Sequence, residues 1–293
     1  MILEYVVNEN QSFTDFLNQL QLPKNLMSPV LSQNLIQVNG ETLPFYREVK
    51  KGDIVTLMVP EETIDSRISH DHITLKIVYE DDYLLIVNKP YGMPVMVTKS
   101  HPNNTLSNAL CYYYAQNHIM SKIHLINRLD KDTSGLMAIA KNRYVKYLLS
   151  ENLKNKIERE YYCIVHGIPA STHQVINLPI LKENQDSMKR IVHPSGLNAI
   201  TEYTVIKSFD DCSLLKVSLR TGRTHQIRVH LSHMGHPIIG DKIYHSQDDL
   251  MEMMLFSHRI KLTHPITHSF IDINLDIPES FKTFIIEKGQ NLE

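Results

Sequence analysis

Hydrophobic spacing over the first sixty residues predicts two helices followed by a hairpin sheet. Apolar residues recur at helical spacing from Phe13 to Leu20, and a second short helix is expected around Leu26 to Leu31. The pair Asn39-Gly40 then predicts a tight turn between two short strands. Another turn at residues 51–53 precedes an apolar strand over residues 54–59. These elements indicate a small unit with a core of its own.

A polar stretch over residues 61–72 follows this unit and lacks periodicity, so we interpret it as a linker. It would join a domain over residues 1–60 to a larger domain over residues 73–293. In the larger domain short apolar strands outnumber amphipathic helices and often follow one another directly, which favours an α+β fold. Strands are expected at 73–79, 83–89, 136–141, 159–167, 202–209, 213–219, 254–262 and 269–277, and helices at 105–116, 143–156 and 281–288.

Charge and cysteine content narrow the class of protein. The 293 residues carry 30 Lys+Arg against 32 Asp+Glu, a formal net charge of −2, which does not suit a general polycation that coats nucleic acid. Three widely spaced cysteines without a Cys-x-x-Cys pattern indicate a reducing compartment. No stretch reaches the ~20 apolar residues that span a bilayer. We therefore expect a cytoplasmic protein without a membrane segment.

The segment TGRTHQIRVHLSHMGH, residues 221–236, combines a helical pattern with many polar side chains. If Thr221 or Thr224 caps a helix there, His225 and Arg228 share one face. The opposite face would pack on a core through Ile227, Leu231 and Met234. The segment is therefore a candidate for a helix that carries basic groups to a site.

Two interpretations of its basic residues remain open. Gly222 allows a tight turn before the helix, where backbone amides and Arg223 would hold a phosphate or carboxylate; alternatively, the basic residues are simply solvated. A zinc site is less consistent with the spacing, because on a helix only His230 and His233 share a face, and the segment contains no acidic residue. The spacing therefore predicts no metal site.

A second polar stretch, HLINRLDKDTSGLMAIAK, residues 124–141, places Asp130 where an apolar run ends. The next five residues are expected to turn before a buried strand resumes. Arg128 and Lys131 flank Asp130 and would keep its carboxylate ionised, which suits a nucleophile or a charge-stabilising group better than a general acid. The alternative is a turn in which Asp130 or Asp132 accepts hydrogen bonds from the following amides.

Together, the segments NRLDKDTSGL, REYYCIVHG and LRTGRTHQIRVHLSHMGHPIIGDKIY resemble the signatures of RluA/RluD-type pseudouridine synthases. The resemblance continues in family order through YEDDYLLIVNKPYGMPV and LFSHRIKLTHP, and covers residues 73 to about 285. Residues 1–60 are similar to the RNA-binding motif of the ribosomal small-subunit protein four type. The resemblance implies an α+β fold, with a mixed, mainly antiparallel central sheet and flanking helices, plus a small N-terminal α/β RNA-binding-like domain.

The resemblance implies isomerisation of a uridine within structured RNA, either ribosomal or transfer RNA, with large-subunit rRNA favoured. The N1–C1′ bond breaks and the base is rejoined through C5, with no metal or organic cofactor. Asp130 corresponds to the catalytic aspartate, which either attacks C1′ or removes a C2′ proton. Arg228 is implied to pair with it, and Tyr161 to stack on the base. Arg128 is implied to fill the space of the flipped nucleotide. RNA contact is also expected from Arg223, His225 and Lys89.

Three observations qualify this assignment. Asn127 stands where the family usually has His, which keeps hydrogen bonding but loses a titratable group; we expect activity to survive. Residues 1–65 hold 4 Lys+Arg against 9 Asp+Glu, and this acidic balance does not suit an RNA-binding module. The unit would then bind RNA weakly, dock onto a partner or stabilise the fold. Strand alternation puts Tyr161 and Tyr162 on opposite faces, so one is expected to be ordinary core.

Two other classes of function remain as alternatives. One is a catalytically inactive RNA-binding or ribosome-assembly factor that retains the fold, which a turnover assay would distinguish. The other is a metallohydrolase built on the histidines, which metal analysis would distinguish. Nucleotide cofactors and serine-hydrolase chemistry have no support, because no P-loop, GxGxxG or GxSxG occurs.

Overall fold

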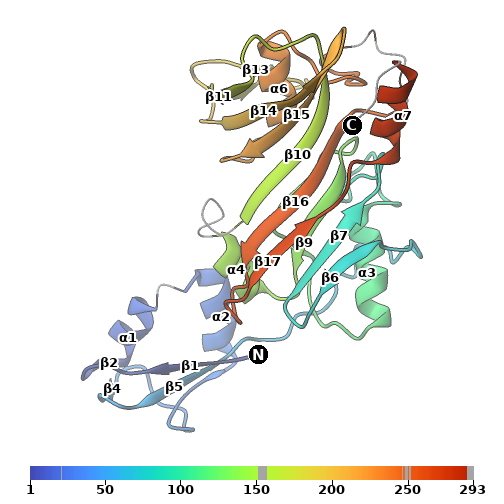
Figure 1. The fold of residues 1–293 in the computed structure, drawn as a ribbon. Helices are drawn as coiled ribbons and strands as arrows, with labels where there is room; N and C mark the ends of the chain where they lie inside the picture. Colours follow the sequence, from blue (N-terminus) through green and yellow to red (C-terminus); the bar gives the residue numbers. More distant parts are fainter. Residues whose placement is uncertain (21, 151–156, 246, 248–249, 251, 289–293) are drawn as a thin grey trace.

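The chain folds around two sheets, each with a hydrophobic core of its own (Figure 1). A three-stranded sheet belongs to the N-terminal residues and a ten-stranded sheet to the remainder. The large sheet is mixed and mainly antiparallel with flanking helices, so the predicted α+β class is confirmed. The computed structural model describes residues 1–20, 22–150, 157–245, 247, 250 and 252–288.

The N-terminal unit contains the two helices and the hairpin that the sequence predicts. Ser12 caps the first helix by accepting a hydrogen bond from the amide of Asp15 at 3.0 Å. Asn39 and Gly40 form the expected two-residue turn, both with positive φ. The elements are β1 (Ile2–Val6), β2 (Gln11–Ser12), α1 (Phe13–Gln19), α2 (Lys24–Ser32), β3 (Ile36–Val38), β4 (Glu48–Val49) and β5 (Ile54–Met58).

The large sheet runs in the order β11-β14-β15-β10-β16-β9-β7-β6, with β17 beside β16 and β8 beside β9. Among the described strands only β9 and β16 pair in parallel. The strands are β6 (Ile77–Glu80), β7 (Leu84–Lys89), β8 (His124–Leu125), β9 (Ser134–Ala140), β10 (Ile157–His166), β11 (His173–Asn177), β14 (Ile200–Ser208), β15 (Cys212–Leu219), β16 (Leu255–Thr263) and β17 (Phe270–Asn274).

Helices and one small hairpin complete this part of the chain (Figure 1). The hairpin pairs β12 (Ile180–Lys182) with β13 (Arg190–Val192), and helix α6 contacts β13. The helices are α3 (Leu106–Gln116), α4 (Arg143–Ser150), α6 (Gln226–His233) and α7 (Glu279–Glu287). None of the helices in the described ranges is long and apolar enough to cross a membrane.

Element boundaries differ from the prediction at several points. The first expected strand begins only at Ile77, and the last one ends at Asn274. Gly135 was expected in a turn, but it lies in β9, where a Cβ would stand 2.3 Å from the carbonyl oxygen of Ser257. Glycine therefore permits the close parallel pairing of β9 with β16. The final part of the expected helix over 143–156, including Leu153, lies outside the described residues.

Residues 61–72 form no helix or strand, and Glu62 and Ser69 of this segment contact the rest of the chain. Glu62 is 7% exposed and accepts hydrogen bonds from His124 at 2.5 Å and from Arg143 at 2.7 Å. Arg143 also donates to the carbonyl of Asn25 in α2, at 2.7 Å. The side chain of Asn108 donates to Ser69. The segment is thus fixed between the two sheets.

Glu62 makes the stability of this junction depend on pH. Burial opposes its charge, but the hydrogen bonds and charges of His124 and Arg143 outweigh burial and lower its pKa to about 2. A carboxyl with a depressed folded-state pKa stabilises the fold above its ordinary value of 4.5, and this stabilisation is lost as pH falls from 4.5 towards 2. We expect Glu62→Gln to lower the melting temperature, with a gap to the wild type that shrinks over that window.

Circular dichroism melts at several pH values would measure this gap. Glu61→Gln is the matched control, because Glu61 is the exposed neighbour and should give no pH-dependent gap. A gap for Glu62→Gln that stays constant from pH 6 to pH 2 would contradict the ionic role of Glu62.

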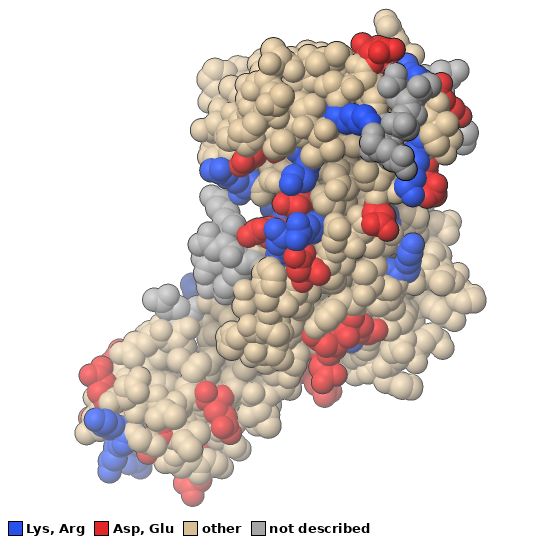
Figure 2. Space-filling model, in the orientation of Figure 1, with Lys and Arg blue, Asp and Glu red and all other residues tan. Residues whose placement is uncertain are grey.

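The acidic character of the N-terminal unit is visible at its surface. Figure 2 shows acidic side chains at several places on this unit and a basic group at its far end. Lys50 and Lys51 are exposed, as are the aromatic side chains of Phe45 and Tyr46. The similarity of this unit to an RNA-binding motif stays a prediction.

Candidate active site

Asp130 lies between β8 and β9, at the point where the chain turns into the centre of the large sheet. Its carbonyl accepts a hydrogen bond from the amide of Thr133 at 3.2 Å and so closes the turn. Its carboxylate is 26% exposed and accepts a hydrogen bond from Nη1 of Arg228 at 3.0 Å. The alternative turn, closed by an aspartate side chain, is therefore not formed by Asp130.

Helix α6 brings Arg228 to this carboxylate, but it begins differently from the prediction. His225 is the N-cap residue and adopts a left-handed conformation with φ of 57°. The side-chain oxygen of Gln226 accepts hydrogen bonds from the amide of Arg223 and the hydroxyl of Thr221, and this closes the preceding turn. Neither predicted threonine caps the helix. Ile227 and Leu231 are buried as expected, whereas Met234 follows the helix and is 37% exposed.

Arg228 joins Asp130 to a second, fully buried carboxylate. Its Nε and Nη2 donate to the two oxygens of Asp241 at 2.7 and 2.8 Å, and Nη1 remains for Asp130. Burial opposes the charge of Arg228, but the hydrogen bonds and charge of Asp241, followed by those of Asp130, outweigh it and raise its pKa. Arg228 is therefore a permanent positive charge, held rigidly by Asp241 and directed at Asp130.

His225 approaches the same oxygen of Asp130 from the other side. The hydroxyl of Tyr244 accepts from the amide of Arg190 at 2.9 Å and lies 3.1 Å from Nδ1 of His225. The Tyr244 hydroxyl can donate its proton to Nδ1, and a neutral imidazole bonded in this way carries its own proton on Nε2. Nε2 lies 3.8 Å from Oδ2 of Asp130.

The two neighbours leave one oxygen of Asp130 available. Arg228 and His225 both face Oδ2, and Oδ1 has no hydrogen-bond partner among the described residues. Burial lowers the pKa of His225, against the opposing charge of Asp130, which favours the neutral imidazole. The arrangement presents a carboxylate oriented by a guanidinium, with one free oxygen, which suits nucleophilic attack or proton removal.

Tyr161 lies on β10 near this carboxylate but is almost completely buried. It is 4% exposed and packs in the main core, opposite Ser257 of the neighbouring strand β16. Burial raises its pKa, so the phenol is protonated at neutral pH. Tyr162 points to the opposite face and stacks on His258 with ring centroids 3.8 Å apart, as alternation predicts. A base-stacking role for Tyr161 stays a prediction.

Lys89 does not lie on an RNA-facing surface, contrary to our expectation. It is fully buried, and its ammonium donates to the carbonyls of Pro90, Met93 and Lys131 at 2.9 to 3.0 Å. Burial is the main cause that lowers its pKa to about 8, against the opposing charges of Asp132 and Asp130. Lys89 therefore ties the loop after β7 to the loop that carries Asp130, because three carbonyls satisfy a buried ammonium.

The remaining predicted residues surround the carboxylate loop. Asn127 is buried and accepts a hydrogen bond from the amide of Ala138 at 2.8 Å, so it supports the loop without a titratable group. Arg128 is exposed. The pKa of the half-buried Lys146 is lowered mainly by burial and further by the positive charge of Arg128. Arg223 is exposed and donates to the carbonyl of Asn198 at 3.1 Å.

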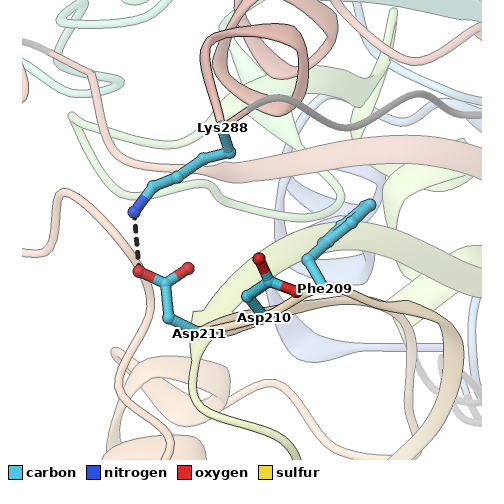
Figure 3. Close-up of a pocket in the computed structure, with 4 residues that line it drawn as sticks. All are labelled: Phe209, Asp210, Asp211 and Lys288. Atoms are coloured by element: carbon cyan, nitrogen blue, oxygen red, sulfur yellow. Dashed lines mark hydrogen bonds and ion pairs between the residues drawn. The ribbon is translucent and has the colours of Figure 1, made fainter.

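A hollow of about 420 Å³ lies against Lys131, the neighbour of Asp130 in sequence. Polar side chains of one loop line most of it, including Ser100, His101 and Asn103, and no carboxylate contributes to it. A second hollow, of about 180 Å³, is formed at the turn between β14 and β15 (Figure 3). Its lysine, Lys288, is already paired with Asp211 at 2.7 Å, and none of its residues faces Asp130. Of these two hollows, only the first includes a residue of the loop that carries Asp130.

Sequence reasoning missed three residues that support the site. These are Asp241, which holds Arg228, Tyr244, which lies against His225, and Ser257, which stands opposite Tyr161 on β16. A signal existed for Asp241, because an aspartate that follows the apolar run Pro237–Gly240 is expected to need a buried cationic partner. Ser257 had no such signal, because its role depends on the pairing of β16 with β10.

The histidines of α6 and its flanks have other partners. His230 is fully buried, with Nδ1 2.8 Å from the hydroxyl of Thr201 and Nε2 2.9 Å from the carbonyl of Leu178. His236 lies 2.9 Å from the carbonyl of His166. Within the described ranges, no group of three or more His, Cys, Asp and Glu side chains has the arrangement of a metal site.

Comparison with known proteins places this site in a family. The model of the RNA pseudouridylate synthase family matches residues 83–233, slightly more than half of the chain and both loops of the site. The chain belongs to this family. The predicted resemblance is thereby confirmed for the larger part of the chain, and with it the prediction that the protein is an RNA isomerase.

Similar members of the family span nearly the same length. An RNA pseudouridine synthase of Bacillus subtilis named YhcT is 34% identical over 96% of this chain and 95% of its own. Ribosomal large subunit pseudouridine synthase D of Pasteurella multocida is 34% identical over 86% of this chain and 82% of its own. The solved structure of human RNA pseudouridylate synthase domain containing 4 has a TM-score of 0.58 at 23% identity, covering 70% of this chain and 89% of its own, which shows a shared fold.

Proposed function

We propose that this pseudouridine synthase converts a uridine of large-subunit ribosomal RNA to pseudouridine, with Asp130 as the catalytic carboxylate. The observation that carries the proposal is the partly exposed carboxylate of Asp130, which is hydrogen-bonded to Arg228, lies near His225 and keeps one oxygen free. The relatives named ribosomal large subunit pseudouridine synthase D, at 34% identity, favour ribosomal RNA as the substrate.

The reaction rearranges bonds within one nucleotide. The N1–C1′ bond of the uridine breaks, the base turns, and a C5–C1′ bond forms; C5 loses its proton and N1 gains one. Asp130 either attacks C1′ or removes a C2′ proton before the base turns. Both routes require an ionised carboxylate with a free oxygen, which is Oδ1 in this site. A protonated Asp130 would serve neither route, so the permanent charge of Arg228 is part of the mechanism.

The exposed groups around Asp130 support access of a flipped nucleotide. A uridine inside structured RNA must leave its stack, which costs a few kcal/mol. Arg128 and Lys131 are exposed on either side of Asp130, and the hollow beside Lys131 has room for part of the RNA. We propose that Arg128 and Arg223 contact this RNA, while His225 acts on Asp130 more than on RNA.

Mapping pseudouridines in ribosomal and transfer RNA, from cells with and without this gene, tests the substrate. We expect one or a few pseudouridines of large-subunit rRNA to disappear and to return when the gene is restored. Loss confined to transfer RNA would replace the proposed substrate and keep the reaction. An unchanged map, together with no turnover by the purified protein on either RNA, would favour the inactive ribosome-assembly factor.

A further inference from the structure

A buried arginine with no partner lies next to Tyr161. Arg159 belongs to β10, is 6% exposed, and has an Nε that is buried without a hydrogen-bond acceptor. Its guanidinium forms no hydrogen bond or ion pair with any of the residues that the structure describes. The other buried arginine of the site, Arg228, is paired with two carboxylates. A buried charge without a counter-charge is costly, so Arg159 differs from an ordinary structural arginine.

The guanidinium of Arg159 reaches the surface at Gly222. A Cβ at position 222 would lie 3.0 Å from Nη1 and 3.8 Å from Nη2 of Arg159, so any side chain there would press on the guanidinium. Gly222 is itself exposed and precedes the exposed Arg223. The two terminal nitrogens of Arg159 thus lie beside this exposed glycine, in the turn that leads into α6.

This turn belongs to the same site as the catalytic carboxylate. Burial raises the pKa of Tyr161, the charge of Arg159 lowers it, and the charge of Asp130 raises it further. The arginine and the aspartate therefore both lie near this tyrosine. The turn continues into His225 and Arg228, which face Asp130. A nucleotide whose sugar reaches Asp130 therefore brings its own backbone close to Gly222 and Arg159.

We propose that Arg159 and the turn at Gly222 form a subsite for a backbone phosphate next to the target uridine. A guanidinium presents two parallel N–H groups that match two oxygens of a phosphate. A phosphate also supplies the missing negative charge, whereas a uracil carbonyl would leave the buried charge uncompensated. The absence of a side chain at Gly222 leaves room for the phosphate oxygens. This inference rests on the proposed function, because the phosphate belongs to the RNA substrate.

The first test compares RNA binding by the wild type and Arg159→Gln, using a transcript of large-subunit rRNA at several salt concentrations. Loss of one phosphate contact should weaken binding about tenfold or more at low salt and reduce the slope of log K against log salt by about one unit. The variant should raise KM by about the same factor, with kcat changed less than about twofold. Arg159→Lys should keep the salt slope of the wild type but recover only part of the RNA affinity. The lysine ammonium keeps the charge but lacks the two parallel N–H groups of the guanidinium.

The matched control is Arg220→Gln, two residues before Gly222. Arg220 is exposed and already paired with Glu202 at 2.9 Å, so its loss should change neither the salt slope nor KM appreciably. Melting temperatures of all three variants would show whether each remains folded. If a folded Arg159→Gln kept the salt slope of the wild type, the proposal of a phosphate subsite would be wrong. If kcat fell while KM stayed the same, Arg159 would act on the reacting base and not on a phosphate.

The second test removes the charge from the RNA. In a synthetic stem-loop that contains the modified uridine, one methylphosphonate replaces the phosphate on the 5′ or the 3′ side. One of the two should weaken wild-type binding about tenfold and have no further effect on Arg159→Gln. If the methylphosphonate weakened binding by Arg159→Gln as much as binding by the wild type, at both positions, then Arg159 would not pair with either phosphate. Binding is measured without turnover, so a wild type that binds RNA but modifies no rRNA would overturn the proposed function and not this subsite.

Discussion

Asp130→Asn is expected to abolish pseudouridine formation while the protein remains folded and still binds RNA. The amide can still accept the hydrogen bond of Arg228, so the loop should keep its shape. It cannot act as a nucleophile or remove a proton, so turnover should fall by at least about 10³-fold. Release of tritium from RNA labelled at C5 of uridine measures turnover, because C5 loses its proton only when the new bond is completed.

The control for this variant is Asp82→Asn, the same change at an exposed aspartate between β6 and β7. It should leave turnover, RNA affinity and melting temperature unchanged. Because Asp130 is partly exposed, Asp130→Asn should alter the free energy of unfolding by no more than about 1 kcal/mol. Turnover within about tenfold of the wild type would exclude Asp130 as the catalytic residue. An unfolded variant would instead assign Asp130 a structural role.

The sequence predicts that His225 and Arg228 act together, but not the way in which they do so. Both face the same oxygen of Asp130, yet only Arg228 lies within α6, whereas His225 is its left-handed N-cap residue. The segments that carry Asp130, Tyr161 and Arg228 are separated by about thirty and seventy residues, and only the family resemblance brings them together in the sequence. Pairing of β9 and β10 with β16 brings the loop before β9 towards Tyr161, and helix α6 adds Arg228.

Features that depend on tertiary packing could not be predicted in the same way. Lys89 looks like an RNA contact in the sequence, because lysines are usually exposed, yet three loop carbonyls hold it in the interior. The cap of α6 is decided by the side chain of Gln226, which bonds both to the preceding turn and to β14, and not by a threonine. The lack of a partner for Arg159 among the described residues depends on how the strands around β10 pack, which the sequence does not reveal.

Arg228→Ala is expected to be both inactive and strongly destabilised. Arg228 is 3% exposed, and its removal leaves Asp241 buried without a counter-charge and Asp130 without its cation. Breaking a buried ion pair on one side costs about 3–5 kcal/mol, because the remaining charge is uncompensated. Denaturant unfolding would measure this loss, and tritium release would show turnover reduced nearly as much as by Asp130→Asn.

The double variant Arg228→Ala/Asp241→Asn separates the two roles of the guanidinium. The side-chain amide introduced at position 241 removes the stranded charge, and its oxygen can still accept hydrogen bonds from the backbone amides of Ile243 and Tyr244, so much of the lost stability should return. Turnover should not return, because Asp130 still lacks its cation. Recovered activity in the double variant would show that Arg228 acts only through the fold. Recovered stability without activity would show that the Asp241 contact supports the fold, while the 3.0 Å contact with Asp130 serves the reaction.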